Sequence, residues 1–106
     1  MASSAKKLTT IENFAPGESQ IWHWNNATPP NAVWYIQGVP RESSFTTDIP
    51  ADQSVEVEVT RVWRRLNRTK HGGEIPSYDF EHEVWYVIKN VGTREVDIDV
   101  YASIIS

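Results

Sequence analysis

The chain has 106 residues, a net charge of −4, five tryptophans and no cysteine. This length suits one domain with a hydrophobic core, and the lack of cysteine excludes disulfides, thiol chemistry and cysteine-ligated zinc. The negative charge argues against non-specific nucleic-acid binding. Residues 1–10 resemble no signal peptide, and no segment approaches the roughly 20 apolar residues that span a bilayer. We therefore expect a soluble protein that is cytoplasmic or secreted without a leader, and the compartment stays open.

The first half of the chain contains short runs in which apolar and polar residues alternate, as they do in half-buried strands. Residues 1–7 lack this pattern and are expected to form a disordered arm. We assign the tryptophans at positions 22, 24 and 34 to the core, because aromatic residues on early strands of a sandwich are usually buried. The predicted strands are residues 8–14, 19–25 and 32–39, with a further short strand at 45–47 inside a polar connection.

Residues 54–67 form the longest strand candidate. Its valines occupy every second position up to Val59, whereas Val62 and Leu66 follow in the opposite phase. A β-bulge near Thr60 and Arg61 would absorb this slip. Residues 68–77, with adjacent glycines, are expected to be a loop or hairpin tip, after which the chain returns as a strand over residues 79–89.

The last third, residues 82–104, predicts a β-hairpin with one buried face. Two registers place the same apolar residues inside. One has residues 90–92 in the loop, and the other has residues 91–93. Charge pairing favours the second register, in which Ile88 pairs with Val96, Tyr86 with Ile98, and Val84 with Val100. The Asn-x-Gly turn between alternating strands is similar to the closing hairpin of many immunoglobulin-like and lectin-like sandwiches.

These patterns predict an all-β protein, a single-domain antiparallel β-sandwich of six to seven strands over residues 8–106. A jelly-roll or a small β-barrel is the alternative. No stretch of eleven or more residues has the apolar spacing of a helix.

One candidate site is a basic aromatic strand that carries Arg61, Trp63, Arg65 and Arg68. Guanidinium groups beside an indole form cation–π contacts and keep donors free for a phosphate or carboxylate. The alternative is structural. If residues 54–67 pair with residues 79–89, these arginines lie across from the odd-numbered acidic residues and only fix the strand register. Those acidic residues are Asp79, Glu81 and Glu83.

A second candidate site is the outer face of the predicted final hairpin, with Trp85, Asp97, Asp99 and Tyr101. An aromatic platform beside carboxylates suits a neutral sugar, which stacks on the ring and donates its hydroxyl protons. The alternative is a solvated outer sheet face, which is usually polar in antiparallel sheets.

No catalytic motif, phosphate loop or metal-binding spacing occurs, so we expect no enzyme activity, no cofactor and no metal. The sequence favours a lectin-like binding module that holds a glycan or another small polar ligand. One alternative is a self-assembling structural subunit that forms a homo-oligomer by joining complementary basic and acidic surfaces. Another is a membrane-surface protein that binds lipid head groups.

Overall fold

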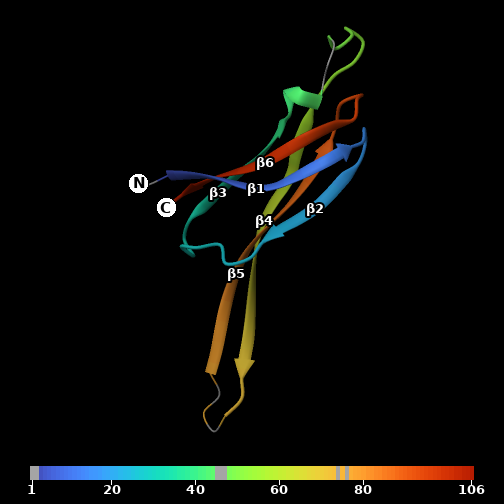
Figure 1. The fold of residues 1–106 in the computed structure, drawn as a ribbon. Coiled ribbons are helices and arrows are strands. Elements are labelled where there is room, and N and C mark those ends of the chain that lie inside the picture. Colours follow the sequence, from blue (N-terminus) through green and yellow to red (C-terminus); the bar gives the residue numbers. More distant parts are fainter. Residues whose placement is uncertain (1–2, 45–47, 74, 76) are drawn as a thin grey trace.

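The computed structural model describes residues 3–44, 48–73, 75 and 77–106. Two three-stranded antiparallel sheets pack as a small open sandwich (Figure 1). Sheet 1 has the order β1 (Ser3–Phe14), β6 (Val96–Ile105), β3 (Val33–Pro40). Sheet 2 has the order β2 (Ser19–Trp24), β5 (Ser77–Asn90), β4 (Val57–His71).

This architecture confirms the predicted all-β sandwich and excludes a closed barrel. The described residues form six strands and a single turn of 3₁₀ helix, η1 (Glu42–Ser44). None of their helices is long and apolar enough to cross a membrane. The strand expected at residues 45–47 lies outside the described residues.

The N-terminal segment differs from its prediction. Strand β1 begins at Ser3, so residues 3–7, assigned to a disordered arm, form regular pairs with β6 up to Lys7 opposite Tyr101. Main-chain hydrogen bonds to a neighbouring strand need no apolar side chains, which is why the polar sequence gave no sign of this pairing.

The predicted pairing of the last two strands is wrong. Strand β5 is central in sheet 2 and β6 is central in sheet 1, so the two strands face each other across the core. Ile88 pairs with Gln20 and Val59 rather than with Val96. Neighbouring strands of one sheet and strands of two facing sheets both have apolar residues at every second position. This period alone therefore does not show whether two strands pair with each other or face each other across the core.

The connection between β5 and β6 is fixed by Asn90, which is fully buried. Its Nδ2 donates hydrogen bonds to the carbonyl oxygens of Phe14 (2.9 Å) and Arg94 (2.8 Å), and its Oδ1 accepts one from Gly92 N (2.9 Å). A Cβ on Gly92 would lie 2.6 Å from the carbonyl oxygen of Ser54, so only glycine fits this close approach.

The β4–β5 pairing and its bulge are confirmed. Arg65 lies opposite Glu83, and the register shifts between Val59 and Arg61, as the change of apolar phase predicts. The strands extend further than expected, however. Strand β4 continues to His71 and β5 starts at Ser77, so half of the predicted 68–77 loop is paired.

The core lies between the two sheets and contains the alternating residues that the sequence assigned to it. Trp34 is buried, and Trp22 and Trp24 are half-buried against the core, in line with their assignment. The fully buried apolar side chains of β5 and β6 are Val84, Tyr86, Ile88, Val96, Ile98, Val100 and Ala102.

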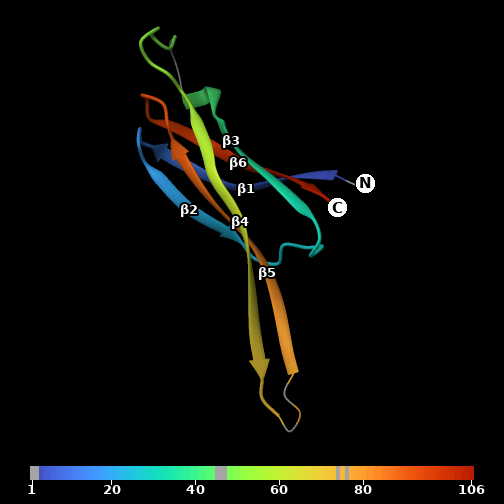
Figure 2. The same cartoon turned by 180° about the vertical axis from the view of Figure 1, so that it is seen from behind.

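The β4–β5 hairpin projects well beyond the sandwich (Figures 1 and 2). Strand β2 accompanies β5 only as far as the pair Trp24–Val84, so residues 65–71 and 77–83 continue as a two-stranded ribbon, here called, with Ile75 at its tip, the hairpin extension. The chain measures 66 × 30 × 19 Å with a radius of gyration of 17.8 Å. A compact domain of this length has a radius of gyration of about 13 Å.

Candidate functional site

Three aromatic rings from three strands stack on the outer face of sheet 2. His23 on β2, Trp85 on β5 and Trp63 on β4 are direct cross-strand neighbours. The ring centroids of His23 and Trp85 are 4.5 Å apart, and those of Trp85 and Trp63 are 6.0 Å apart. We call these three residues the aromatic ladder. The sequence singled out both tryptophans but left His23 unassigned, because the β2–β5 pairing that places it here was unknown.

Two arginines of β4 cover the aromatic ladder. The Arg61 guanidinium carbon lies 4.2 Å from the ring centroid of Trp63, and that of Arg65 lies 5.4 Å from the ring centroid of Trp85. The predicted grouping of Arg61, Trp63 and Arg65 on one face is therefore confirmed. Cation–π contacts of this kind stabilise the face by about 0.5 to 1 kcal/mol each at exposed sites.

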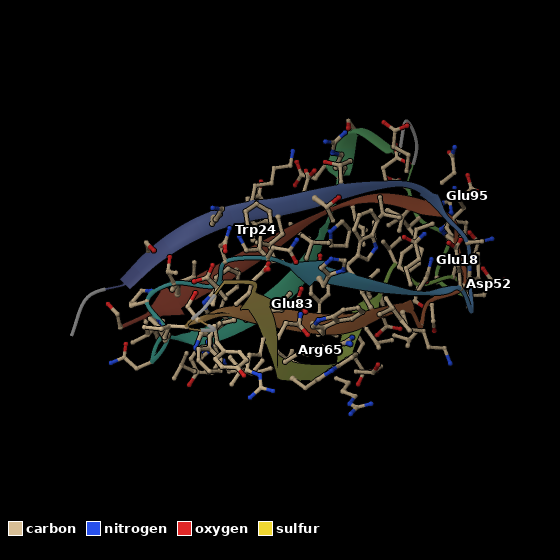
Figure 3. All side chains as sticks on the ribbon, turned by 90° about the horizontal axis from the view of Figure 1, so that it is seen from below. Glu18, Trp24, Asp52, Arg65, Glu83 and Glu95 are labelled. Carbon is tan, nitrogen blue, oxygen red and sulfur yellow. The ribbon has the colours of Figure 1, made fainter. Side chains whose placement is uncertain are left out.

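Glu83 adds a carboxylate beside the ladder and is 7% exposed. Trp85 Nε1 donates a hydrogen bond to Glu83 Oε1 at 3.0 Å. Arg65 and Glu83 occupy paired positions on β4 and β5, and both are labelled in Figure 3. Each indole of the ladder is thus in contact with a ring and a cation of its own chain, which is the arrangement expected of a register-fixing cluster.

Arg68 does not join this cluster. It lies in the hairpin extension, three residues beyond Arg65, and its guanidinium carbon is 4.5 Å from the ring centroid of Tyr78. Side chains alternate between the two faces of a strand, so Arg68 projects from the face opposite Arg61 and Arg65.

The second predicted site is divided between two sheets. Trp85 lies on sheet 2, whereas Asp97, Asp99 and Tyr101 lie on β6 in sheet 1. The outer faces of the two sheets point away from each other, so Trp85 cannot form one platform with these three residues. The cause is the incorrect hairpin pairing, which had placed β5 and β6 side by side.

Asp99 is the centre of a polar network that joins β1, β6 and the segment after β3. Its Oδ2 accepts a hydrogen bond from Arg41 Nε (2.9 Å), and its Oδ1 accepts from Arg41 Nη2 (2.8 Å) and Thr10 Oγ1 (2.8 Å). Lys7 Nζ is 3.1 Å from Oδ1. The bidentate hydrogen bond from Arg41 lowers the pKa of Asp99 far below its usual range, with smaller contributions from Thr10 and Lys7. Both carboxylate oxygens are therefore used within the chain.

Asp97 and Tyr101 also lie beside residues of their own chain. Asp97 Oδ1 accepts a hydrogen bond from the backbone nitrogen of Asn13 (2.8 Å), which has a positive φ of 54° next to an irregularity in the β1–β6 register. Tyr101 is exposed beside Tyr35 and Val39 on the outer face of sheet 1. Asp97 thus holds a bend in β1, and Tyr101 belongs to an exposed aromatic and aliphatic surface.

The hairpin extension carries exposed apolar side chains that sequence reasoning missed, and they share a face with Arg68, which pairs with Phe80. Leu66 is 56% exposed and Phe80 is 60% exposed, although both lie on the face that continues into the core at Val84, which is 1% exposed. Ile75 at the tip is 87% exposed. The signal was present in Tyr78 and Phe80, which extend the even-numbered apolar series of β5, but the prediction for this segment considered only its odd-numbered acidic residues.

A pocket of about 390 Å³ lies where the hairpin extension leaves the sandwich. Arg64 Nη1 crosses it to donate a hydrogen bond to the carbonyl oxygen of Ala32 at 2.6 Å. The indole nitrogen of Trp34, another lining residue, is buried and has no hydrogen-bond partner in the described part of the chain. We call this the corner pocket. Most of its walls are apolar, formed by Pro30, Ala32, Val33, Trp34, Val62 and Val84.

Comparison with protein-family models, with curated proteins and with solved structures gave no match. The described residues also contain no group of three or more His, Asp or Glu side chains placed to hold a metal ion. Two surfaces of this chain, the aromatic ladder and the hairpin extension, remain as candidates for a functional site.

Proposed function

We propose that the protein is a structural subunit that assembles with further copies of itself through the hairpin extension. The observation that carries this proposal is the uncovered inner face of the extension, where Leu66 and Phe80 are exposed beside Arg68 and continue the core face of β5 beyond the end of the sandwich. A two-stranded ribbon by itself is at best marginally stable in water, so a partner surface would stabilise the part of this hairpin that lies beyond the sandwich. Exposed apolar patches rimmed by charged residues typically mark protein interaction sites.

Sedimentation velocity across a dilution series tests this function. The wild-type chain should change from an oligomer to a monomer on dilution, because the proposed contact buries the exposed apolar side chains of the extension. Phe80→Ser should raise the dissociation constant about tenfold or more, as loss of a central aromatic contact usually does.

Tyr35→Ser is the matched control, because Tyr35 is 61% exposed, close to Phe80 at 60%, but lies on sheet 1. It should leave the dissociation constant unchanged. A wild-type chain that stays monomeric at every concentration would contradict the proposed function.

A second candidate function, supported by the aromatic ladder, is binding of a carbohydrate or another polar ligand on the outer face of sheet 2. Arg61 and Arg65 retain donors that are not used in the cation–π contacts, and these suit an anionic group such as an acidic sugar or a lipid phosphate. A glycan screen and a vesicle-binding assay with anionic lipid separate the two ligand sources. Binding should be lost in Trp63→Ala and kept in Tyr101→Ala, and equal binding by both variants would reject the ladder as the site.

A further inference from the structure

The corner pocket lies on the side of the sandwich where both sheets have an edge strand. Strand β3 is an edge of sheet 1 and β4 is an edge of sheet 2, and the two strands contact each other. The walls of the pocket come from both layers, with Ala32 and Trp34 on one side and Val62 and Val84 on the other. Val62 is 42% exposed, so the pocket opens to solvent between the two edges.

Arg64 places a cation on the inner face of β4, which is otherwise apolar here. Val62 and Leu66 lie two positions away on the same face, and Arg64 pairs with Val84, which is 1% exposed. Arg64 Nη1 donates a hydrogen bond to the carbonyl oxygen of Ala32. A guanidinium group has five N–H donors, so donors remain beyond the one that Ala32 accepts. The pocket therefore combines apolar walls with one positive charge.

Trp34 contributes a second donor from the opposite wall. Its side chain is 8% exposed, and its indole nitrogen is buried without a hydrogen-bond partner among the residues that the structure describes. A buried N–H that lacks a partner is costly, and an acceptor that reached this nitrogen from the pocket would offset the cost. None of the described lining residues is acidic. Both the charge and the buried N–H thus suit an anionic acceptor.

The size of the corner pocket suits a small molecule rather than a chain segment. Its volume is about 390 Å³, near the lower end of the range of roughly 300 to 1,000 Å³ that is usual for ligand pockets. Such pockets have mostly apolar walls and a few polar groups that fix the orientation of the ligand. The matching ligand has an apolar body and a single acidic group.

We propose that the corner pocket binds a small carboxylic acid with an apolar body, such as a medium-chain fatty acid. The body packs against Ala32, Val62 and Val84. Arg64 reaches the wall that holds Trp34, because it bonds to the carbonyl oxygen two positions before it, so one carboxylate accepts hydrogen bonds from both side chains. This binding requires neither assembly through the hairpin extension nor a ligand on the aromatic ladder.

A titration with octanoate at neutral pH tests this site by proton–nitrogen NMR, in which each of the five indole N–H groups gives its own signal. The variant Trp34→Phe identifies the Trp34 signal by its loss. Octanoate should shift this signal with a dissociation constant of about 1 mM or lower, which is attainable for a ligand of this size. Acetate, which lacks the apolar body, should bind at least about tenfold more weakly.

Arg64→Gln separates recognition of the carboxylate from a structural role of the side chain. It should raise the dissociation constant for octanoate about tenfold or more, because a charge-assisted hydrogen bond is lost, and leave that for neutral octanol within about twofold. Arg68→Gln is the matched control, since Arg68 lies on the same face of β4 but does not line the pocket. Val62→Phe should weaken binding of both ligands by filling the pocket.

The possible results decide between this site and its alternatives. A Trp34 signal that does not move at about 10 mM octanoate would overturn the proposal, and so would equal losses of octanoate and octanol binding in Arg64→Gln. Binding that is lost in Phe80→Ser but kept in Arg64→Gln would place the acid on the hairpin extension and reject the pocket. If the chain stays monomeric in sedimentation while octanoate shifts the Trp34 signal, the proposed assembly fails and the pocket stands.

Discussion

Strands β4 and β5 pass through two regions, and sheet 1 covers only one of them. Inside the sandwich, the even-numbered side chains of β5 from Val84 to Ile88 are nearly inaccessible, because sheet 1 lies over them. In the hairpin extension the same series continues through Phe80 and Tyr78, which are exposed. Alternation therefore indicates which face is apolar, whereas burial depends on whether a second layer is present.

The largest loss of stability is expected where an aliphatic side chain is shortened in the covered region. Ile98→Ala should lower the free energy of unfolding by about 2 to 5 kcal/mol, because Ile98 is fully buried and the sandwich cannot collapse onto the cavity. Urea unfolding at low protein concentration, where the chain is monomeric, provides the measurement. A loss below about 1 kcal/mol would mean that the two sheets are not tightly packed.

A substitution at Asn90 tests whether the stability of the sandwich depends on the β5–β6 connection as well as on the core. Asn90→Ala should cost about 1 to 3 kcal/mol, because it removes the hydrogen bonds that the side chain donates to two carbonyl oxygens and the one that it accepts from Gly92 N, which then keeps only its bond to Glu56 O. Asn31→Ala, at an exposed position, should be near neutral by comparison. Equal effects of the two substitutions would show that the β5–β6 connection does not need these hydrogen bonds.

A substitution at Asp99 tests whether its hydrogen bonds and ion pairs on the outer face of sheet 1 stabilise the sandwich. Its pKa is lowered in the folded chain, so its ionised form stabilises the fold above the unfolded carboxyl pKa of about 3.9, and this stabilisation is lost as the pH falls toward the folded pKa. We therefore expect Asp99→Asn to be less stable than wild type near neutral pH and to lose less stability on acidification below about pH 4. Parallel acid-limb curves for the two proteins would contradict the network.

The smallest expected effect belongs to the extension. Leu66→Ala should change the unfolding free energy of the monomer by no more than about 0.5 kcal/mol, because the side chain is already 56% exposed. The same variant should weaken association, which repeats of the urea and sedimentation measurements at high concentration would detect. A large loss of monomer stability would mean that the extension is packed against its own chain.

Much of the fold followed from sequence pattern. Alternation located β2 and β3 closely, identified the buried series of β5 and β6, and placed the bulge of β4 at the change of phase after Val59. These features depend on residues close together in the chain, where a period of two translates directly into faces of a strand.

The same local patterns misassigned the partners of the strands. The predicted pairing of Ile88 with Val96 was wrong, because facing and neighbouring strands share one apolar period. That error brought Trp85 together with Asp99, which lie on opposite outer faces, and it hid the stacking of His23 on Trp85. Partner choice between strands is set by long-range backbone hydrogen bonds, which leave little trace in side-chain order.

Sequence pattern was enough to predict the class of fold, the faces of the strands and the grouping of Arg61, Trp63 and Arg65, because each of these follows from alternation within single strands. The packing of the strands, in contrast, places Arg41 against Asp99 and leaves Leu66 and Phe80 without a covering layer. Both facts depend on where separate strands end relative to one another, and a strand's own residues do not record the length of the sheet that lies over it.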